Sequence, residues 1–313
     1  MSLVVDPMSE PPPDGRRDTL RSLGRVGIWT FALDRQPAPK AGKFLADVES
    51  LGFRALWIPE GLGSKEAFAH AGVLLATSAR LTVATGIASI WARDAVAMAN
   101  GSRTLADAFP GRFVLGIGVS HESSVTRRGE VYRRPLARMR EYLDAMAEAP
   151  HACPDPERPA PVVLAALGPK MLELAAGRAA GAHTYFVPPE HTEIAREVMG
   201  AGPFLSPEQA AILETDPDRA RRIARKYMSG YVDLPNYANN LVRLGWSEDD
   251  LSDGGTDKLV DAIVAWGDEE AISSRVQAHL DAGADHVSVQ MLGERSADLP
   301  TEQLRRLAPA FVP

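Results

Sequence analysis

His121 and Glu60 are the ionisable residues best placed for chemistry, because each follows a buried, strand-like segment of the sequence. An imidazole has an unperturbed pKa of about 6.5, so His121 can donate or accept a proton at neutral pH. Trp29 and Phe186 lie at the ends of two further segments of this kind and offer flat apolar surfaces. No His-Glu-x-x-His pattern or carboxylate cluster accompanies them, so no metal site is predicted. Few charges and several aromatic rings favour a pocket for a flat, conjugated cofactor.

A second candidate lies in residues 81–90, which begin as an apolar strand and then reach Thr85, Gly86 and Ile87. A glycine inside a strand usually marks a bulge or a place where a ligand approaches the backbone closely. We therefore expect these three residues to contact a bound cofactor.

The third candidate is the segment 165–171, Ala-Ala-Leu-Gly-Pro-Lys-Met, where a strand gives way to a helix. Gly168 can make the turn, and Pro169 suits the first helical position. Free backbone N–H groups at a helix N-terminus bind phosphate well, and Lys170 adds a positive charge. The hypothesis is a phosphate site formed by Ala166, Leu167, Gly168, Pro169, Lys170 and Met171. The alternative is an ordinary tight turn between a strand and a helix.

Strand-like segments that alternate with helical ones would position these candidates. The strands are expected at residues 25–31, 54–59, 81–87, 112–118, 162–166, 182–187, 208–214 and 285–291. This alternation predicts an α/β fold, a (β/α)8 TIM barrel, in which active sites lie at the carboxyl ends of the strands. An open doubly wound sheet is the alternative, but it would require a Gly-x-Gly-x-x-Gly loop after the first strand, and the sequence has none there.

The chain is expected to consist of a tail and one domain. Residues 1–24 include a Pro-Pro-Pro-Asp-Gly run and lack an apolar signal core, so we expect a flexible N-terminal tail. Residues 25–313 are expected to form a single barrel domain. Residues 216–266, between the seventh and eighth strands, have helical spacing. This helical insertion either covers the barrel mouth and helps to choose the substrate or provides a dimer surface.

Composition excludes several classes of function. The 313 residues are 45% hydrophobic and 24% charged, with a net charge of -7 and no basic stripe, so nucleic acid is not an expected partner. No apolar run approaches the length of a membrane span. Cys153 is the only cysteine, which excludes an internal disulfide and fits a cytoplasmic location.

Longer motifs resemble a known family. They are Ala84-Thr85-Gly86-Ile87 followed by IWARD at 90–94, GRFVLGIGVSH at 111–121, the segment 165–171, and GAHTYFV at 181–187. Over residues 24–292 the chain resembles the luciferase-like flavin and deazaflavin oxidoreductases, which are (β/α)8 barrels. Within them it is most similar to an actinobacterial subgroup that uses the deazaflavin coenzyme F420.

The resemblance implies roles for individual residues. Gly86–Ile87 would be a non-prolyl cis peptide that backs the deazaflavin ring, and residues 168–171 would hold the cofactor's phosphate. Ser124 matches a polar cofactor contact in the loop 119–134. Glu60 stands where relatives often carry Asp near the cofactor's polar edge, so its contact departs from the pattern, and a solvated rim charge is the alternative. A homodimer is also implied.

His121 matches the position of a catalytic Glu in a relative that oxidises a sugar phosphate. Hydride transfer to a carbonyl leaves an anion that needs a proton, and an imidazole beside the ring could exchange it. The alternative is a purely hydrogen-bonding role. Trp29 is expected to form a wall of the pocket. His183 and His286 begin strands, at the end of a barrel that serves stability, and are expected to be structural.

The predicted function is hydride transfer between coenzyme F420 and a small organic substrate, which is a carbonyl, an alcohol or an activated alkene. An FMN-dependent monooxygenase on the same fold is the first alternative, because both cofactors present a tricyclic ring and a phosphate. The second is a barrel that binds a cofactor without catalysis, an option suggested by the few ionisable groups on the rim.

Overall fold

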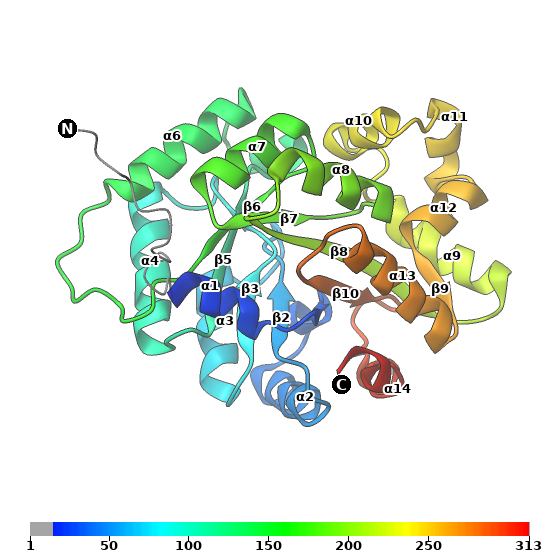
Figure 1. Cartoon of the computed structure of the whole chain (residues 1–313), viewed down its shortest axis with the longest axis horizontal. Helices are drawn as coiled ribbons and strands as arrows, with labels where there is room; N and C mark the ends of the chain where they lie inside the picture. Colours follow the sequence, from blue (N-terminus) through cyan, green and yellow to red (C-terminus); the bar gives the residue numbers. More distant parts are fainter. Residues whose placement is uncertain (1–14, 313) are drawn as a thin grey trace, which may run out of the picture.

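The computed structural model describes residues 15–312, and its centre is a closed ring of parallel strands (Figure 1). β1 pairs with both β2 and β10, and β8 pairs with β7 and β10, which closes the ring. The eight barrel strands are β1 (Val26–Trp29), β2 (Ala55–Ile58), β3 (Thr82–Thr85), β5 (Phe113–Gly118), β6 (Val162–Ala165), β7 (Gly181–Thr184), β8 (Phe204–Leu213) and β10 (Val287–Met291). The predicted (β/α)8 barrel is therefore confirmed.

Helices surround the barrel and fill the connections between its strands (Figure 1). The helices that follow β1 to β7 are α2 (Ala38–Ser50), α3 (Ala67–Thr77), α4 (Ala95–Ala108), α5 (Glu122–Arg127), α6 (Pro135–Ala147), α7 (Pro169–Arg178) and α8 (Pro189–Met199). Those that follow β8 are α9 (Pro217–Met228), α10 (Pro235–Arg243), α11 (Glu248–Leu251), α12 (Asp257–Ile263), α13 (Glu269–Asp281) and α14 (Thr301–Phe311). None of the helices in residues 15–312 is long and apolar enough to cross a membrane.

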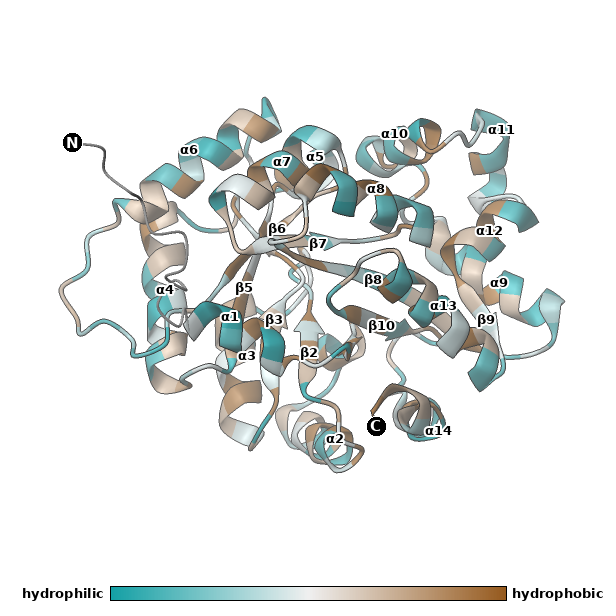
Figure 2. Cartoon of the chain, in the orientation of Figure 1, coloured by the Kyte–Doolittle hydropathy of each residue, from teal (hydrophilic) through white to brown (hydrophobic). Residues whose placement is uncertain are grey.

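The helices form where the sequence provides a terminus and an apolar face. Asp94 accepts a hydrogen bond from Ala97 N at 2.9 Å and so caps α4. Proline occupies the first turn of α7, α8 and α9, where a missing N–H costs nothing. The helices in Figure 2 carry both hydrophobic and hydrophilic residues, as expected for elements with one face on the barrel.

Two clusters of buried residues hold the barrel together. The larger lies between the strands and the helices and includes Ile28, Val83 and Leu115. The smaller lies inside the barrel around Trp57 and Val114. The helices after β8 have a third cluster of their own, which includes Ile223, Leu241 and Val260.

Four sequence-based boundaries are wrong in detail. The tail expected at 1–24 contains α1 (Gly15–Ser22), because Leu20 and Leu23 are buried against the barrel, whereas residues 1–14 lie outside the described part. The seventh strand begins at Phe204 rather than 208. The polar loop 119–134 contains α5, and the segment 216–266 ends in a short strand, β9 (Ala265–Gly267), that pairs with β8.

Aromatic and imidazole rings fill the barrel interior beneath the cavity at the carboxyl ends of its strands. Trp57 Nε1 donates to His286 Nε2 at 3.1 Å, and the ring of His183 stacks on Trp57 with centroids 4.4 Å apart. Both histidines are almost completely buried, and desolvation lowers the pKa of each to about 4. The two imidazoles are therefore neutral. His286 does not line the cavity, whereas His183 does, so the expected place of His183 at the opposite end of the barrel is wrong.

Candidate active site

A cavity of about 1070 Å³ opens at the carboxyl ends of the barrel strands. It brings together ten of the sequence-predicted residues from five strand ends. They are Trp29, Glu60, Gly86, Ile87, His121, Ser124, Ala166, Leu167, Gly168 and Met171. The volume lies at the upper end of the range for small-molecule sites, so a cofactor and a substrate can share it.

Four predicted residues do not line this cavity. Thr85 is buried, and its hydroxyl both donates to Gly116 O and accepts from Gly116 N. Pro169 and Lys170 are exposed on the first turn of α7, and Phe186 is buried among tyrosines. The side chains of these four residues therefore support the walls of the cavity or lie outside it, and their cofactor contacts stay predictions.

The third barrel strand changes direction at Gly86, and the bond between Gly86 and Ile87 is cis, as the resemblance implies. Beyond this bond the chain resumes as β4 (Ala88–Ser89), which pairs with β5. A side chain at Gly86 would have its Cβ 2.5 Å from Trp29 Nε1. Glycine is therefore needed here because the backbone of the third strand lies directly against the indole of the first.

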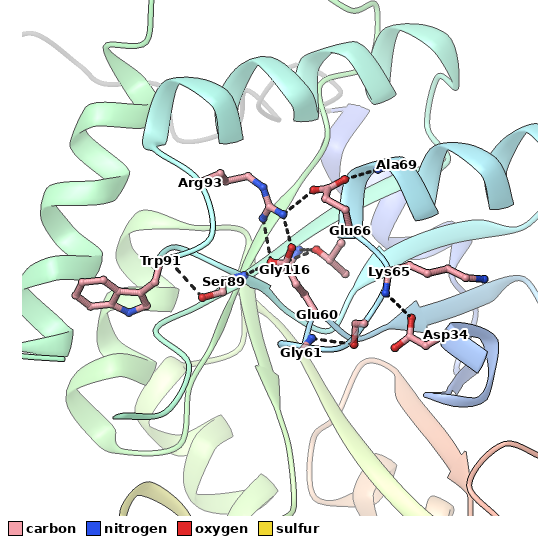
Figure 3. A network of polar contacts seen from close by, with 12 residues as sticks. Asp34, Glu60, Gly61, Lys65, Glu66, Ala69, Ser89, Trp91, Arg93 and Gly116 are labelled. Carbon is pink, nitrogen blue, oxygen red and sulfur yellow. Dashed lines mark hydrogen bonds and ion pairs between the residues drawn. The ribbon is translucent and has the colours of Figure 1, made fainter. Parts of the chain in front are cut away.

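Glu60 is held in place by an ion-pair network (Figure 3). Its carboxylate accepts from Arg93 through both oxygens and from Ser89 N at 2.7 Å, and Arg93 also pairs with Glu66. The Glu60 side chain is only 4% exposed. The alternative of a solvated rim charge is therefore wrong: Glu60 is a buried, paired carboxylate that anchors the strand carrying the cis bond, and its contact with a cofactor stays a prediction. Sequence reasoning missed Arg93 in this role.

The turn predicted to bind phosphate begins α7 at Gly168, and Arg243 of α10 faces it. A Cβ at Gly168 would lie 3.4 Å from Arg243 Nη2, so the guanidinium is close to the glycine backbone. Arg243 donates to Asn240 Oδ1 at 3.0 Å. Backbone N–H groups and a guanidinium together suit an anion. Sequence reasoning missed Arg243, because it follows Gly168 by 75 positions and no short pattern connects the two.

His121 lies at the cavity wall with its ring against α10. Nδ1 is 2.9 Å from Asn236 Oδ1, and the centroid of the imidazole is 5.4 Å from that of Tyr237. Desolvation lowers the pKa of His121, and the hydrogen bond with Asn236 offsets part of that effect. The imidazole is therefore neutral at pH 7 and suited to accept a proton.

A cluster of aromatic rings that the sequence did not reveal forms the wall of the cavity beside His121. The cluster contains Tyr185, Phe186, Tyr227, Tyr231 and Tyr237, with neighbouring centroids between 5.0 and 6.2 Å apart. Tyr185 OH donates to Gln290 Oε1 at 2.8 Å and lies 3.0 Å from Tyr231 OH. Tyr227 of α9, Tyr231 of the following turn and Tyr237 of α10 all come from the segment after β8, so residues of this segment line the cavity.

Glu208 lies on β8 and is 1% exposed. Its Oε2 accepts from Phe186 N at 3.3 Å, whereas Oε1 has no hydrogen-bond partner in the described residues. Desolvation raises the pKa of this carboxyl to about 8, so it is protonated at neutral pH. A single Glu in a strand that is otherwise uncharged was the one available sequence signal for it.

The described residues hold no group of three or more His, Cys, Asp or Glu side chains able to bind a metal ion. The arrangement is thus a deep cavity with a backbone wall, an aromatic wall, a neutral histidine and an anion-suited turn. It defines an enzyme of the (β/α)8-barrel class with its site at the carboxyl ends of the strands. The chain belongs to the luciferase-like monooxygenase family, whose model matches residues 25–286, and it is an oxidoreductase by class.

Similarity to individual proteins agrees with this assignment. A 5,10-methylenetetrahydromethanopterin reductase of Archaeoglobus fulgidus is 24% identical over 284 residues, which cover 76% of this chain and 85% of the relative. An F420-dependent secondary alcohol dehydrogenase, solved with an F420-acetone adduct, has a TM-score of 0.73 at 15% identity, covering 92% of this chain and 99% of the other. The FMN complex of the oxygenating constituent of 3,6-diketocamphane monooxygenase from Pseudomonas putida has a TM-score of 0.67 at 15% identity, covering 93% and 98%.

Proposed function

We propose that this protein is a coenzyme F420-dependent oxidoreductase that acts on a small organic substrate. The observation that carries the proposal is that one cavity contains both the Gly86–Ile87 backbone wall and the Gly168 turn. A tricyclic ring and a phosphate on one cofactor need these two features in the same space. The fold similarity to the F420-dependent secondary alcohol dehydrogenase supports the choice of a deazaflavin.

The residues present fit such a cofactor. The backbone is accessible at Gly86 and at Gly168 because neither residue has a side chain. A Cβ at Gly86 would meet the Trp29 indole that lines the cavity, and a Cβ at Gly168 would meet Arg243. Trp29 Nε1 is buried without a hydrogen-bond partner in the described residues, and the indole lines the cavity. In this proposal Trp29, Gly86 and Ile87 contact the ring, Ser124 contacts a polar edge, and the turn at 166–168 with Met171 holds the phosphate. A bound deazaflavin supplies or takes up a hydride.

Side chains of this protein then accept the proton of the substrate and limit the access of water to the reacting atoms. His121 is neutral at pH 7, so its free ring nitrogen can take the proton of a substrate hydroxyl. The aromatic wall of Tyr185, Tyr231 and Tyr237 limits water beside the reacting atoms. Glu60 makes no direct chemical contribution here, since its carboxylate is engaged by Arg93 and Ser89. This arrangement favours alcohol substrates over carbonyl substrates.

An FMN-dependent monooxygenase is the second candidate, favoured by the fold similarity to the FMN complex described above. The same turn and backbone wall would receive the ring and phosphate of FMN. Binding of a cofactor without catalysis is the remaining alternative. The homodimer and the cytoplasmic location also remain predictions.

Titration of the purified full chain with coenzyme F420 and, separately, with FMN tests the proposal. Fluorescence and calorimetry should detect micromolar binding of F420 and none of FMN. The variant Gly86→Ala should abolish that binding because its Cβ would displace the buried Trp29 indole, whereas Gly177→Ala, where no atom lies within 4 Å, should bind normally. Tight binding of FMN alone would favour the monooxygenase, and binding of neither would overturn both enzyme assignments.

Alcohol oxidation can then be screened with the bound deazaflavin, with His121→Ala as the variant that should lose turnover while keeping cofactor affinity. Cofactor binding without turnover on a broad panel of alcohols, carbonyls and activated alkenes would favour the non-catalytic alternative.

A further inference from the structure

The hydrogen bond between His121 and Asn236 joins two segments far apart in the sequence. Asn236 is the second residue of α10, and its Oδ1 lies 2.9 Å from His121 Nδ1. Both side chains line the cavity. Among the described residues, Nε2 of His121 has no hydrogen-bond partner. The bond to α10 therefore engages one ring nitrogen and leaves the other available in the cavity wall.

An amide oxygen only accepts hydrogen bonds, so a contact through Oδ1 requires a proton on Nδ1 of the imidazole. A neutral imidazole carries a single N–H, which leaves Nε2 with its lone pair. No charged side chain contributes to the shift in the pKa of His121, which comes from desolvation and from Asn236. The titratable neighbours are Tyr237 on α10, whose pKa burial raises well above 10, and the exposed Glu122 beside His121 in the chain.

We propose that Asn236 is a positioning residue that keeps the Nδ1–H tautomer of His121, so that Nε2 is the proton-accepting atom of the cavity. The proposal rests on the proposed function, in which His121 receives a proton from a substrate hydroxyl. In that step the O–H bond breaks and an N–H bond forms at Nε2. The segment after β8 then contributes to the chemistry itself and not only to the shape of the cavity.

The opposite orientation of the Asn236 amide makes a different prediction. An amide NH2 group donating to Nδ1 would place the single proton of the neutral imidazole on Nε2. His121 would then present an N–H to the substrate instead of a lone pair. The tautomer of one imidazole therefore decides between the two arrangements.

Nitrogen NMR of the full chain, labelled with 15N in histidine only and free of cofactor, measures this tautomer directly. The spectrum of His121→Gln identifies the resonances of His121 among those of the seven histidines. In the unsubstituted protein we expect the proton on Nδ1 of His121 and the unprotonated nitrogen at Nε2. A proton on Nε2 would overturn the proposal.

Three variants provide the controls. Asn236→Leu removes the acceptor, so the proton should shift to Nε2, which is the favoured site in a free histidine side chain. Asn236→Asp keeps the acceptor and adds a negative charge, so Nδ1 should stay protonated and the pKa of His121 should rise by about 1 unit or more. Asn239→Leu changes an exposed residue one turn further along α10 and should alter neither property.

An unchanged tautomer in Asn236→Leu would refute the positioning role. If this variant does not fold, as judged by circular dichroism, the pKa of His121 in Asn236→Asp decides the question, and an unchanged pKa refutes the role. The measurement is separate from the test of the proposed function, because it needs neither cofactor nor substrate. If F420 does not bind but His121 has the expected tautomer, the enzyme assignment is rejected and the positioning role of Asn236 is not.

Discussion

The cavity has two walls of different construction. One wall is the backbone at Gly86 and Ile87, and behind it β3 and β5 pack so closely that a Cβ at Gly116 would lie 1.9 Å from Thr85 O. The segment after β8, by contrast, lines the cavity with whole side chains, among them Tyr231, Asn236 and Tyr237. A backbone wall cannot be reshaped without disturbing the fold, whereas a side-chain wall can change residue by residue. We infer that the first wall fixes the cofactor and the second selects the substrate.

The largest effect is expected from a methyl group placed between β3 and β5, behind the backbone wall. Gly116→Ala would push Cβ into Thr85 O, a backbone atom that cannot move without its strand. We expect a loss of more than about 3 kcal/mol in the free energy of unfolding, or no folded protein. Urea unfolding measures it. Gly177→Ala, in the interior of α7 with no neighbouring atom within 4 Å, should be neutral or stabilising. Equal behaviour of the two variants would remove the basis of the comparison.

The second-largest effect on stability is expected from loss of the ion pair between Arg93 and Glu60, which anchors the backbone wall. Arg93→Leu leaves the Glu60 carboxylate, 4% exposed, without its cation. Breaking a buried pair in this way should cost about 3–5 kcal/mol of stability. Arg305→Leu breaks an exposed pair with Glu302 and should cost less than about 1 kcal/mol. Chemical denaturation of both variants at pH 7 tests the difference, and similar losses would show that Glu60 is not anchored as described.

The third effect is the pH dependence of the barrel interior beneath the cavity. His183 and His286 have folded-state pKa values of about 4, below the unfolded value of about 6.5. The unfolded chain therefore binds more protons between these values, so stability is complete above pH 6.5 and falls as the pH drops towards 4. Each histidine should contribute a loss of about 1.4 kcal/mol per pH unit.

The variant His286→Gln isolates one of these contributions, since its amide oxygen can still accept from Trp57 Nε1. Between pH 6.5 and 5.5 its stability should fall by about 1 kcal/mol less than that of the unsubstituted protein, because the unfolded histidine is only half protonated at pH 6.5. Urea midpoints measured across this range provide the comparison. Parallel curves would mean that folding does not lower the pKa of His286.

The smallest effect is expected on the side-chain wall. Tyr231→Phe removes one hydroxyl, 3.0 Å from Tyr185 OH, and should cost about 1 kcal/mol of stability. Deazaflavin affinity should stay unchanged, whereas turnover of a substrate found by screening should change. Calorimetry and steady-state kinetics separate the two properties. A tenfold loss of cofactor affinity would assign Tyr231 to the cofactor wall and contradict the division proposed here.

The sequence was sufficient for the features set by local patterns. Alternating segments predicted the barrel, and the glycine at position 86 marked a bulge, whereas the cis bond was implied by the family resemblance alone. The first part of β8 was missed because Pro207 interrupts the strand signal, although the strand continues through it. α1 was missed because its sequence, GRRDTLRS, has no apolar stripe and depends on tertiary contacts.

The missed parts of the site depend on long-range contacts. Asn236 follows His121 by 115 positions, and the helical spacing of α10 indicates a buried face with Tyr237 and Leu241 but not the partner of Asn236 beside it. The tyrosines meet because the turn after α9 and the start of α10 bring Tyr231 and Tyr237 against Tyr185, which follows β7. Arg93 and Glu60 are 33 positions apart, and only the bend after Gly86 brings them together. Such contacts come from the paths of loops, which short sequence patterns do not encode.

Helix α1 has a practical consequence for the production of this protein. The match to the family begins at residue 25, so a recombinant version trimmed to that match would lack the helix. Leu20 and Leu23 would be removed from the interior cluster that contains Trp57 and Val114. Water would then reach the end of the barrel opposite the cavity, and the exposed apolar surface would promote aggregation. Expression should therefore start well before Gly15, even though the family resemblance gives no reason to do so.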